Sequence, residues 1–195
     1  AAGRLELTGV SAFPRLGDDG VKVAPHPPAD PVVTGGTSVI PLVARRLAEP
    51  FERLRDAADV FAARTGAPPR IFLANLGDLS VNSARASWMR NFLAAGGIEA
   101  VASEPLHTSA DAGKAFADSG ATIACICSAD TVYAELGEAT AGALEQAGAR
   151  QVLLAGRPKA QEAALKSAGV DAFIYAGVDA IAALTALHEA LGVGD

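Results

Sequence analysis

One stretch of the chain carries most of the side chains that an α/β ligand site would use. Residues 70–97 read RIFLANLGDLSVNSARASWMRNFLAAGG, which predicts a buried strand, then a loop and a helix. Asp78, Ser80, Asn82 and Arg85 supply a carboxylate, a hydroxyl, an amide and a guanidinium. The stretch has no histidine, no cysteine and no glycine-rich phosphate motif. It therefore has the form of a ligand loop without the usual ligand chemistry.

The other candidates for chemistry are scattered along the chain. His26, His107 and His188 share no neighbourhood in the sequence, which argues against a metal site. Cys125 and Cys127 are two positions apart on a predicted strand, so they lie on one face, too close in sequence for a normal disulfide, and are expected to pack in the core of a reduced, cytosolic chain. No GxSxG motif supports a Ser-His-Asp triad.

The surface expectations for this region are simple. His107 is expected to be an exposed loop residue away from the ligand side, and Thr108 or Ser109 to cap the helix that follows. Arg85 and Arg90 are expected to be solvated or to face a subunit. Trp88 is expected to pack in the core, with an interface anchor as the alternative.

The composition describes a globular chain without the marks of nucleic-acid or membrane binding. The chain has 195 residues, of which 50% are hydrophobic and 19% are charged, and its net charge is −6. This length suits one domain of about 120–150 residues with an extension. Because no Lys/Arg run and no apolar stretch of about 20 residues is present, neither nucleic acid nor a membrane is an expected partner.

Three regions follow one another in the chain. Residues 1–41 are rich in proline and are predicted to form an extended arm that wraps another body. Residues 42–68 are predicted to form a linker helix whose regular part begins near Glu49, because Pro50 suits the first turn. Residues 69–195 are predicted to form the α/β domain.

Five βα repeats define the predicted fold of residues 69–195. The apolar runs RIFLAN, IEAV, ATIACICS, RQVLLAG and DAFIYAG are predicted to be strands buried on both faces. Each is followed by a predicted helix, over about 84–95, 109–119, 131–147, 159–167 and 178–191. This pattern predicts a doubly wound, flavodoxin-like, five-stranded parallel sheet with strand order 2-1-3-4-5. Ligands of such sheets bind beyond the carboxyl ends of the strands, here in the loops Asn75–Ala84, Cys127–Val132 and Ala155–Pro158.

Several stretches carry a family resemblance. FLANLG, AGGIEAV, SGATIACICSADTVYAELG and ALEQAGARQVLLAG resemble the carboxyl-terminal cobalamin-binding domain of the methylmalonyl-CoA mutases, most closely in the small subunit of the heterodimeric bacterial enzymes. AEPFERLRDAADVFAARTGAPPRIFLANLG resembles the linker that enters this domain from the substrate barrel of the family. The resemblance implies that residues 1–41 are an arm from a missing barrel domain.

The resemblance also implies where a cofactor would bind. Members that bind cobalamin carry Asp-x-His-x-x-Gly after the first strand, where the His ligates cobalt and the Asp orients it. Without gaps, these places fall on Ser80, Asn82 and Arg85; with Asp78 as the Asp, the His place falls on Ser80. Neither alignment supplies an imidazole.

The other contacts of the family are altered as well. Ser128 remains in the loop after the third strand, where binding members meet the nucleotide tail of the cofactor. The pair Ala155-Gly156 stands where binding members have two glycines after the fourth strand. Together with the first loop, these changes imply a degenerate cobalamin-binding fold.

The functional expectation follows from this resemblance. The chain would be the carboxyl-terminal part of the small subunit of an adenosylcobalamin-dependent, cytoplasmic isomerase of propionate metabolism that interconverts methylmalonyl-CoA and succinyl-CoA. It would hold no cofactor and no metal, contribute no catalytic residue, and form an interface with a large catalytic subunit that holds adenosylcobalamin. Two alternatives are a domain that binds base-on cobalamin and takes part in catalysis, and a free-standing regulatory binding module.

Overall fold

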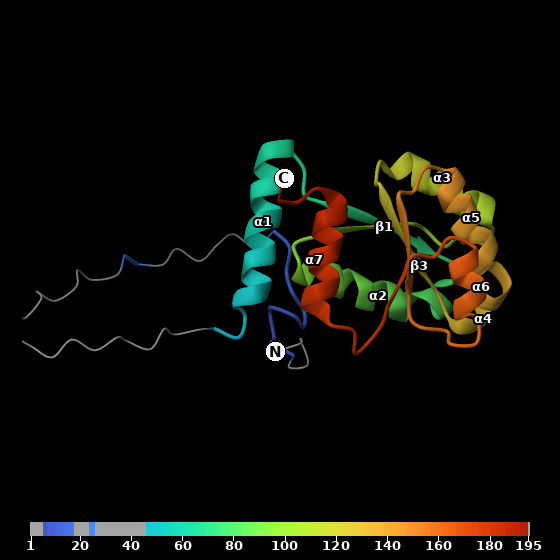
Figure 1. Cartoon of the computed structure of the whole chain (residues 1–195), viewed down its shortest axis with the longest axis horizontal. Coiled ribbons are helices and arrows are strands. Elements are labelled where there is room, and N and C mark those ends of the chain that lie inside the picture. Colours follow the sequence, from blue (N-terminus) through green and yellow to red (C-terminus); the bar gives the residue numbers. More distant parts are fainter. Residues whose placement is uncertain (1–5, 18–23, 26–45, 195) are drawn as a thin grey trace, which may run out of the picture.

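A five-stranded parallel sheet forms the centre of the structure, with helices on both faces (Figure 1). The computed structural model describes residues 6–17, 24–25 and 46–194. The strand order is β2-β1-β3-β4-β5, which confirms the predicted fold class and order. The strands are β1 (Arg70–Asn75), β2 (Glu99–Ala102), β3 (Ile123–Cys127), β4 (Gln151–Ala155) and β5 (Ala172–Ile174).

The three inner strands are buried as predicted, and the two edge strands are not. Every residue of β3 is buried, as are all but the first residues of β1 and β4. The edge strand β2 has no buried residue, and β5 buries only Ile174. An edge strand has a neighbour on one side only, which explains why the expectation of burial on both faces was wrong for these two.

Helices divide the core into two layers. Residues of α1, α2 and α7 pack in one hydrophobic cluster with one face of the sheet, and residues of α3, α5 and α6 pack in the other (Figure 1). The helices are α1 (Glu49–Thr65), α2 (Leu79–Ala95), α3 (Ser109–Ser119), α4 (Asp130–Val132), α5 (Glu138–Gln146), α6 (Glu162–Ser167) and α7 (Ala180–Leu191). A π-helical segment, η1 (Tyr133–Gly137), joins α4 to α5. Among the described residues, no helix is long and apolar enough to cross a membrane.

The linker helix begins where the sequence predicts. Helix α1 starts at Glu49 with Pro50 in its first turn, and it buries Phe51, Leu54 and Ala58. It packs against α7, and Figure 1 shows the two helices side by side. At Gly97 a Cβ atom would lie 2.7 Å from Cβ of Ala58, so glycine permits this close approach.

Part of the predicted arm lies against the domain itself. Within residues 6–17, Val10 packs against the α1/α2/α7 core cluster, and Arg55 Nη2 of α1 donates to the carbonyl oxygen of Arg15 at 2.5 Å. The rest of the predicted arm, apart from residues 24–25, lies outside the described residues.

The structure corrects the first ligand loop. Helix α2 begins at Leu79 rather than near residue 84, so the loop after β1 comprises only residues 76–78. Gly77 has φ +71° and turns the chain, and Asp78 occupies the N-cap with extended backbone. Positions 80, 82 and 85, placed by the resemblance in or beside a cofactor loop, therefore lie on a regular helix.

Candidate functional site

The loops after β1 and β3 are joined to each other at the carboxyl edge of the sheet. The Leu76 N–H donates to the Cys127 carbonyl at 3.0 Å, and Ser128 Oγ donates to the Leu76 carbonyl at 2.8 Å. Ser128 is fully buried. The edge at which sheets of this order bind ligands is therefore tied together by the protein's own polar groups.

Asn82 and Ser80 take different positions on the first turn of α2. Asn82 is 1% exposed, and its Nδ2 donates to the Gly77 carbonyl at 2.8 Å. Its amide thereby closes the tight turn between β1 and α2. Ser80 is exposed to solvent.

Arg85 reaches across the site, and the expectation that it is solvated is met only in part, since its side chain is 30% exposed. Its Nη1 donates to the Ser128 carbonyl at 2.8 Å and its Nη2 to Oδ1 of Asp130 at 2.6 Å. Its guanidinium carbon lies 5.1 Å from the centroid of the Tyr133 ring. This one side chain spans α2 and the β3–α4 loop and rests on η1. Arg90 on the same helix is exposed.

Arg85 also reaches the loop after β4. A Cβ atom at Gly156 would lie 2.9 Å from Cζ of Arg85, and Gly156 has φ +115°. Glycine is therefore required at position 156 both by the backbone conformation and by the guanidinium. Ala155, the last residue of β4, is fully buried.

Tyr133 is the central residue that the sequence did not identify. Its hydroxyl accepts from the Ser128 N–H at 2.7 Å and donates to the Ala155 carbonyl at 2.7 Å, with the Ile126 carbonyl at 3.2 Å. The ring is 1% exposed, and burial raises the pKa of the hydroxyl well above its ordinary value. The hydroxyl therefore joins the ends of β3 and β4 as a neutral group. In the sequence it is one tyrosine after a short loop, which carries no such signal.

The structure brings His107 toward the β1–α2 loop. Its Nε2 lies 3.8 Å from Oδ1 of Asp78, and both side chains are largely exposed. The predicted exposure of His107 is confirmed, but its separation from the ligand side of the sheet is not. Thr108 caps α3, as expected, because its Oγ1 accepts from the Asp111 N–H at 3.1 Å.

The donor groups of this site do not fit a histidine-ligated cobalamin. The His and Gly places of the family motif are occupied by a buried amide and by a guanidinium, both bonded to the protein itself. Cys125 and Cys127 are buried, as predicted, with 4.0 Å between their sulfur atoms. Within the described part of the chain, no three His, Cys, Asp or Glu side chains are grouped to hold a metal ion.

Three known proteins similar in sequence to this chain bear the same subunit name. The chain is 43% identical over 191 residues to the methylmalonyl-CoA mutase small subunit of Streptomyces virginiae, a match that covers 97% of this chain and 28% of that protein. It is 38% identical, with the same coverage, to the probable small subunit of Mycobacterium tuberculosis, and 32% identical over 96% of its length to that of Propionibacterium freudenreichii subsp. shermanii. No protein-family model matches. The chain thus spans about 28% of the length of these relatives.

Proposed function

We propose that this chain, a homologue of part of the methylmalonyl-CoA mutase small subunit, is the carboxyl-terminal domain of such a subunit and binds no cobalamin itself. Its role is to keep the small subunit folded and to contribute to its interface with a large catalytic subunit. That large subunit would hold adenosylcobalamin and carry out the interconversion of methylmalonyl-CoA and succinyl-CoA in the cytoplasm.

The observation that carries this proposal is the position of Arg85. The guanidinium bonds to Ser128 and Asp130 and lies against Gly156 and Tyr133. A ligand entering between the loops after β1, β3 and β4 would have to displace this side chain and break both hydrogen bonds. A ligand would have to replace a charge-assisted hydrogen bond to the Ser128 carbonyl, worth about 1.5–3 kcal/mol, and a partly exposed ion pair with Asp130, worth about 0.5–1 kcal/mol.

A titration with adenosylcobalamin tests the missing cofactor affinity. The purified chain is mixed with the cofactor, and its absorbance is followed in the visible range. We expect no complex at micromolar concentration. A tight complex in which the cofactor keeps its own benzimidazole on cobalt would instead support the base-on alternative. A tight complex in which a protein side chain ligates cobalt would refute the assignment of Asn82 to the place of the missing histidine.

Three variants test why the cofactor would be excluded. Asn82→His alone should remain a non-binder, because residue 82 is buried and Arg85 still fills the space beside it. The double variant Asn82→His with Arg85→Gly should bind adenosylcobalamin weakly at most, because it still lacks a carboxylate at position 80 to orient the new histidine. Arg85→Lys serves as the matched control that keeps the charge. Tight binding by the first variant would show that the pocket is intact and only the ligand is missing.

Co-purification tests the proposed partner. The full-length small subunit and the large subunit are expressed together, with an affinity tag on the large subunit only. We expect the small subunit to elute with it in equal amount. Elution of the large subunit without the small subunit, which then stays in the unbound fraction, would refute the proposed heterodimer and favour the free-standing module.

A further inference from the structure

A cavity separate from the Arg85 site lies at the carboxyl end of β5. Its walls are the middle of α2, the connection from β5 to α7 and the segment 6–17, and its volume is about 340 Å³. Sites for small molecules begin at about 300 Å³. Figure 1 shows the segment 6–17 at the same end of the molecule as the start of α7.

This cavity collects an unusual share of the aromatic side chains. The whole chain has one Trp, two Tyr and seven Phe. Four of these ten line the cavity: Phe13, Trp88, Phe92 and Tyr175. Trp88 and Phe92 are one helical turn apart on α2, and their rings stack with centroids 5.4 Å apart and planes 18° apart. In a chain with 5% aromatic residues, this concentration gives the cavity a largely aromatic wall.

The charge of the lining points to a cation. Glu6 is the one charged side chain that lines the cavity, and it is exposed. Among the residues that the structure describes, no cation forms an ion pair with Glu6. The Tyr175 ring already makes one cation–π contact, because Cζ of Arg157 lies 5.4 Å from its ring centroid. The charge of Arg157 is balanced by Glu162, whose Oε2 lies 3.0 Å from Nε of Arg157.

The backbone holds Phe13 at the cavity in a costly conformation. Phe13 has φ +52°, and within the described residues it is the one residue other than glycine with a positive φ. Its side chain is 75% exposed, so burial in this chain does not repay that strain. The turn before it is fixed, because the Leu7 carbonyl accepts from the N–H groups of Val10, Ser11 and Ala12. Strained residues of this kind concentrate at ligand sites.

We propose that this cavity binds an organic cation, an alkylammonium or guanidinium group held by the aromatic faces and by the carboxylate of Glu6. Cations over aromatic rings are attracted by the negative charge of the ring face, and quaternary ammonium groups are recognised by several rings at once. The group could belong to a free amine or to a Lys or Arg side chain of a partner protein, and the chemistry required of the cavity is the same.

The single tryptophan makes the test direct. Choline chloride and its uncharged isostere 3,3-dimethylbutan-1-ol are each titrated into the 195-residue chain while Trp88 fluorescence is recorded. We expect choline to change the fluorescence saturably and the alcohol to bind about fivefold more weakly, the factor given by one cation–π contact at a surface site. Equal affinity for the two, or no saturable change with choline, would overturn the proposal.

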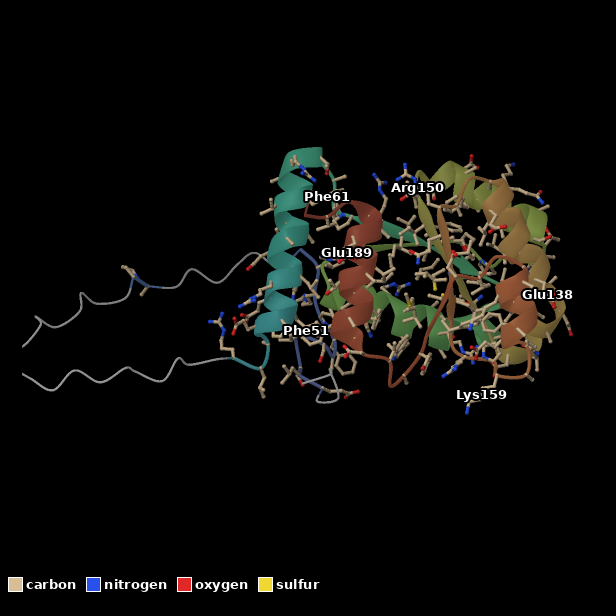
Figure 2. All side chains as sticks on the ribbon, viewed as in Figure 1. Phe51, Phe61, Glu138, Arg150, Lys159 and Glu189 are labelled. Atoms are coloured by element: carbon tan, nitrogen blue, oxygen red, sulfur yellow. The ribbon has the colours of Figure 1, made fainter. Side chains whose placement is uncertain are left out.

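Variants locate the binding within the cavity. Glu6→Gln and Phe13→Leu should each weaken choline binding severalfold, while Phe61→Leu should leave it unchanged. Phe61 is a suitable control because it lies on α1 toward the end away from Phe51 and the segment 6–17 (Figure 2). Circular dichroism checks that all three variants are folded. Unchanged binding in both cavity variants, or an equal loss in Phe61→Leu, would refute the site.

A second pair of ligands distinguishes the two sources of the cation. N-acetyl-arginine amide and N-acetyl-lysine amide are titrated in the same way as choline. Tighter binding of either amide than of choline indicates a side chain of a partner protein, and tighter binding of choline indicates a free amine.

Discussion

Removing the hydroxyl of Tyr133 should destabilise the fold by a predictable amount. Tyr133→Phe keeps the buried ring, so no cavity forms, but it leaves the Ser128 N–H without its acceptor and the Ala155 carbonyl without its donor. A buried polar group left unpaired costs about 1–3 kcal/mol, so we expect a loss of about 2–3 kcal/mol in the free energy of unfolding. For a chain of this size that corresponds to a decrease in Tm of about 4–12 °C.

The second tyrosine supplies the control for this measurement. The Tyr175 hydroxyl accepts from Arg157 at 3.2 Å in an exposed position, so Tyr175→Phe should change the stability by less than about 0.5 kcal/mol. Urea unfolding of both variants and the parent chain gives the two differences. Equal effects of the two substitutions would show that the Tyr133 hydroxyl does not join β3 to β4.

The pH dependence gives an independent check on Tyr133. Burial raises the pKa of its hydroxyl in the folded chain, whereas the unfolded chain loses this proton near pH 10. The folded state therefore retains the proton more strongly, and this contribution to stability is present below about pH 10 and is lost as the pH rises further. The stability of Tyr133→Phe should fall less steeply than that of the parent chain above pH 10. A parallel fall would contradict the buried, neutral hydroxyl.

Three shorter predictions concern neighbouring contacts. In a double-mutant cycle of Arg85→Ala and Asp130→Ala, urea unfolding should give a coupling of about 0.5–1 kcal/mol, since the ion pair is partly exposed; additive effects would contradict the pair. Gly156→Ala should lower the free energy of unfolding by about 1–3 kcal/mol, because residue 156 has a positive φ and a Cβ there would contact Arg85. The same substitution made in the Arg85→Ala variant should cost less, and thermal unfolding of both pairs measures the difference. Burial lowers the pKa of His188, whose Nε2 lies 2.7 Å from the Gly96 carbonyl, so its contribution to stability is present above about pH 6.5 and is lost as the pH falls through the folded pKa. Between pH 7 and pH 5, the His188→Gln variant should therefore lose less stability than the parent chain.

The sequence predicted the fold well because the evidence for each element is local. The apolar runs and the glycines after the helices fix the five βα units, and Pro50 fixes the start of α1. The predicted start of α2 was wrong although Asp78, a residue type favoured at the N-cap, stands directly before the helix. The exposure of β2 and β5 depends on sheet order, which a single strand does not encode.

For the candidate site, the sequence predicted which side chains are missing but not which contacts are made. The absence of an imidazole at positions 80 and 82 is a property of the sequence and needs no structure. What fills the site depends on contacts between distant residues: Arg85 bonds to a carbonyl 43 positions away, and the Tyr133 hydroxyl to one 22 positions away. Both are side chain to backbone contacts, in which the partner's residue type is irrelevant, so no residue pattern reports them.

Several of these contacts converge on one residue of the loop after β3. Ser128 accepts from Arg85 through its carbonyl, donates to Tyr133 through its N–H and donates to Leu76 through its hydroxyl. All three polar groups of this one buried residue are therefore used inside the protein. Moving this loop away from the edge of the sheet would break all three hydrogen bonds and leave groups of Arg85, Tyr133 and Leu76 without their partners. Because the three partners lie on α2, on η1 and in the β1–α2 loop, we expect no single substitution among them to release the loop after β3.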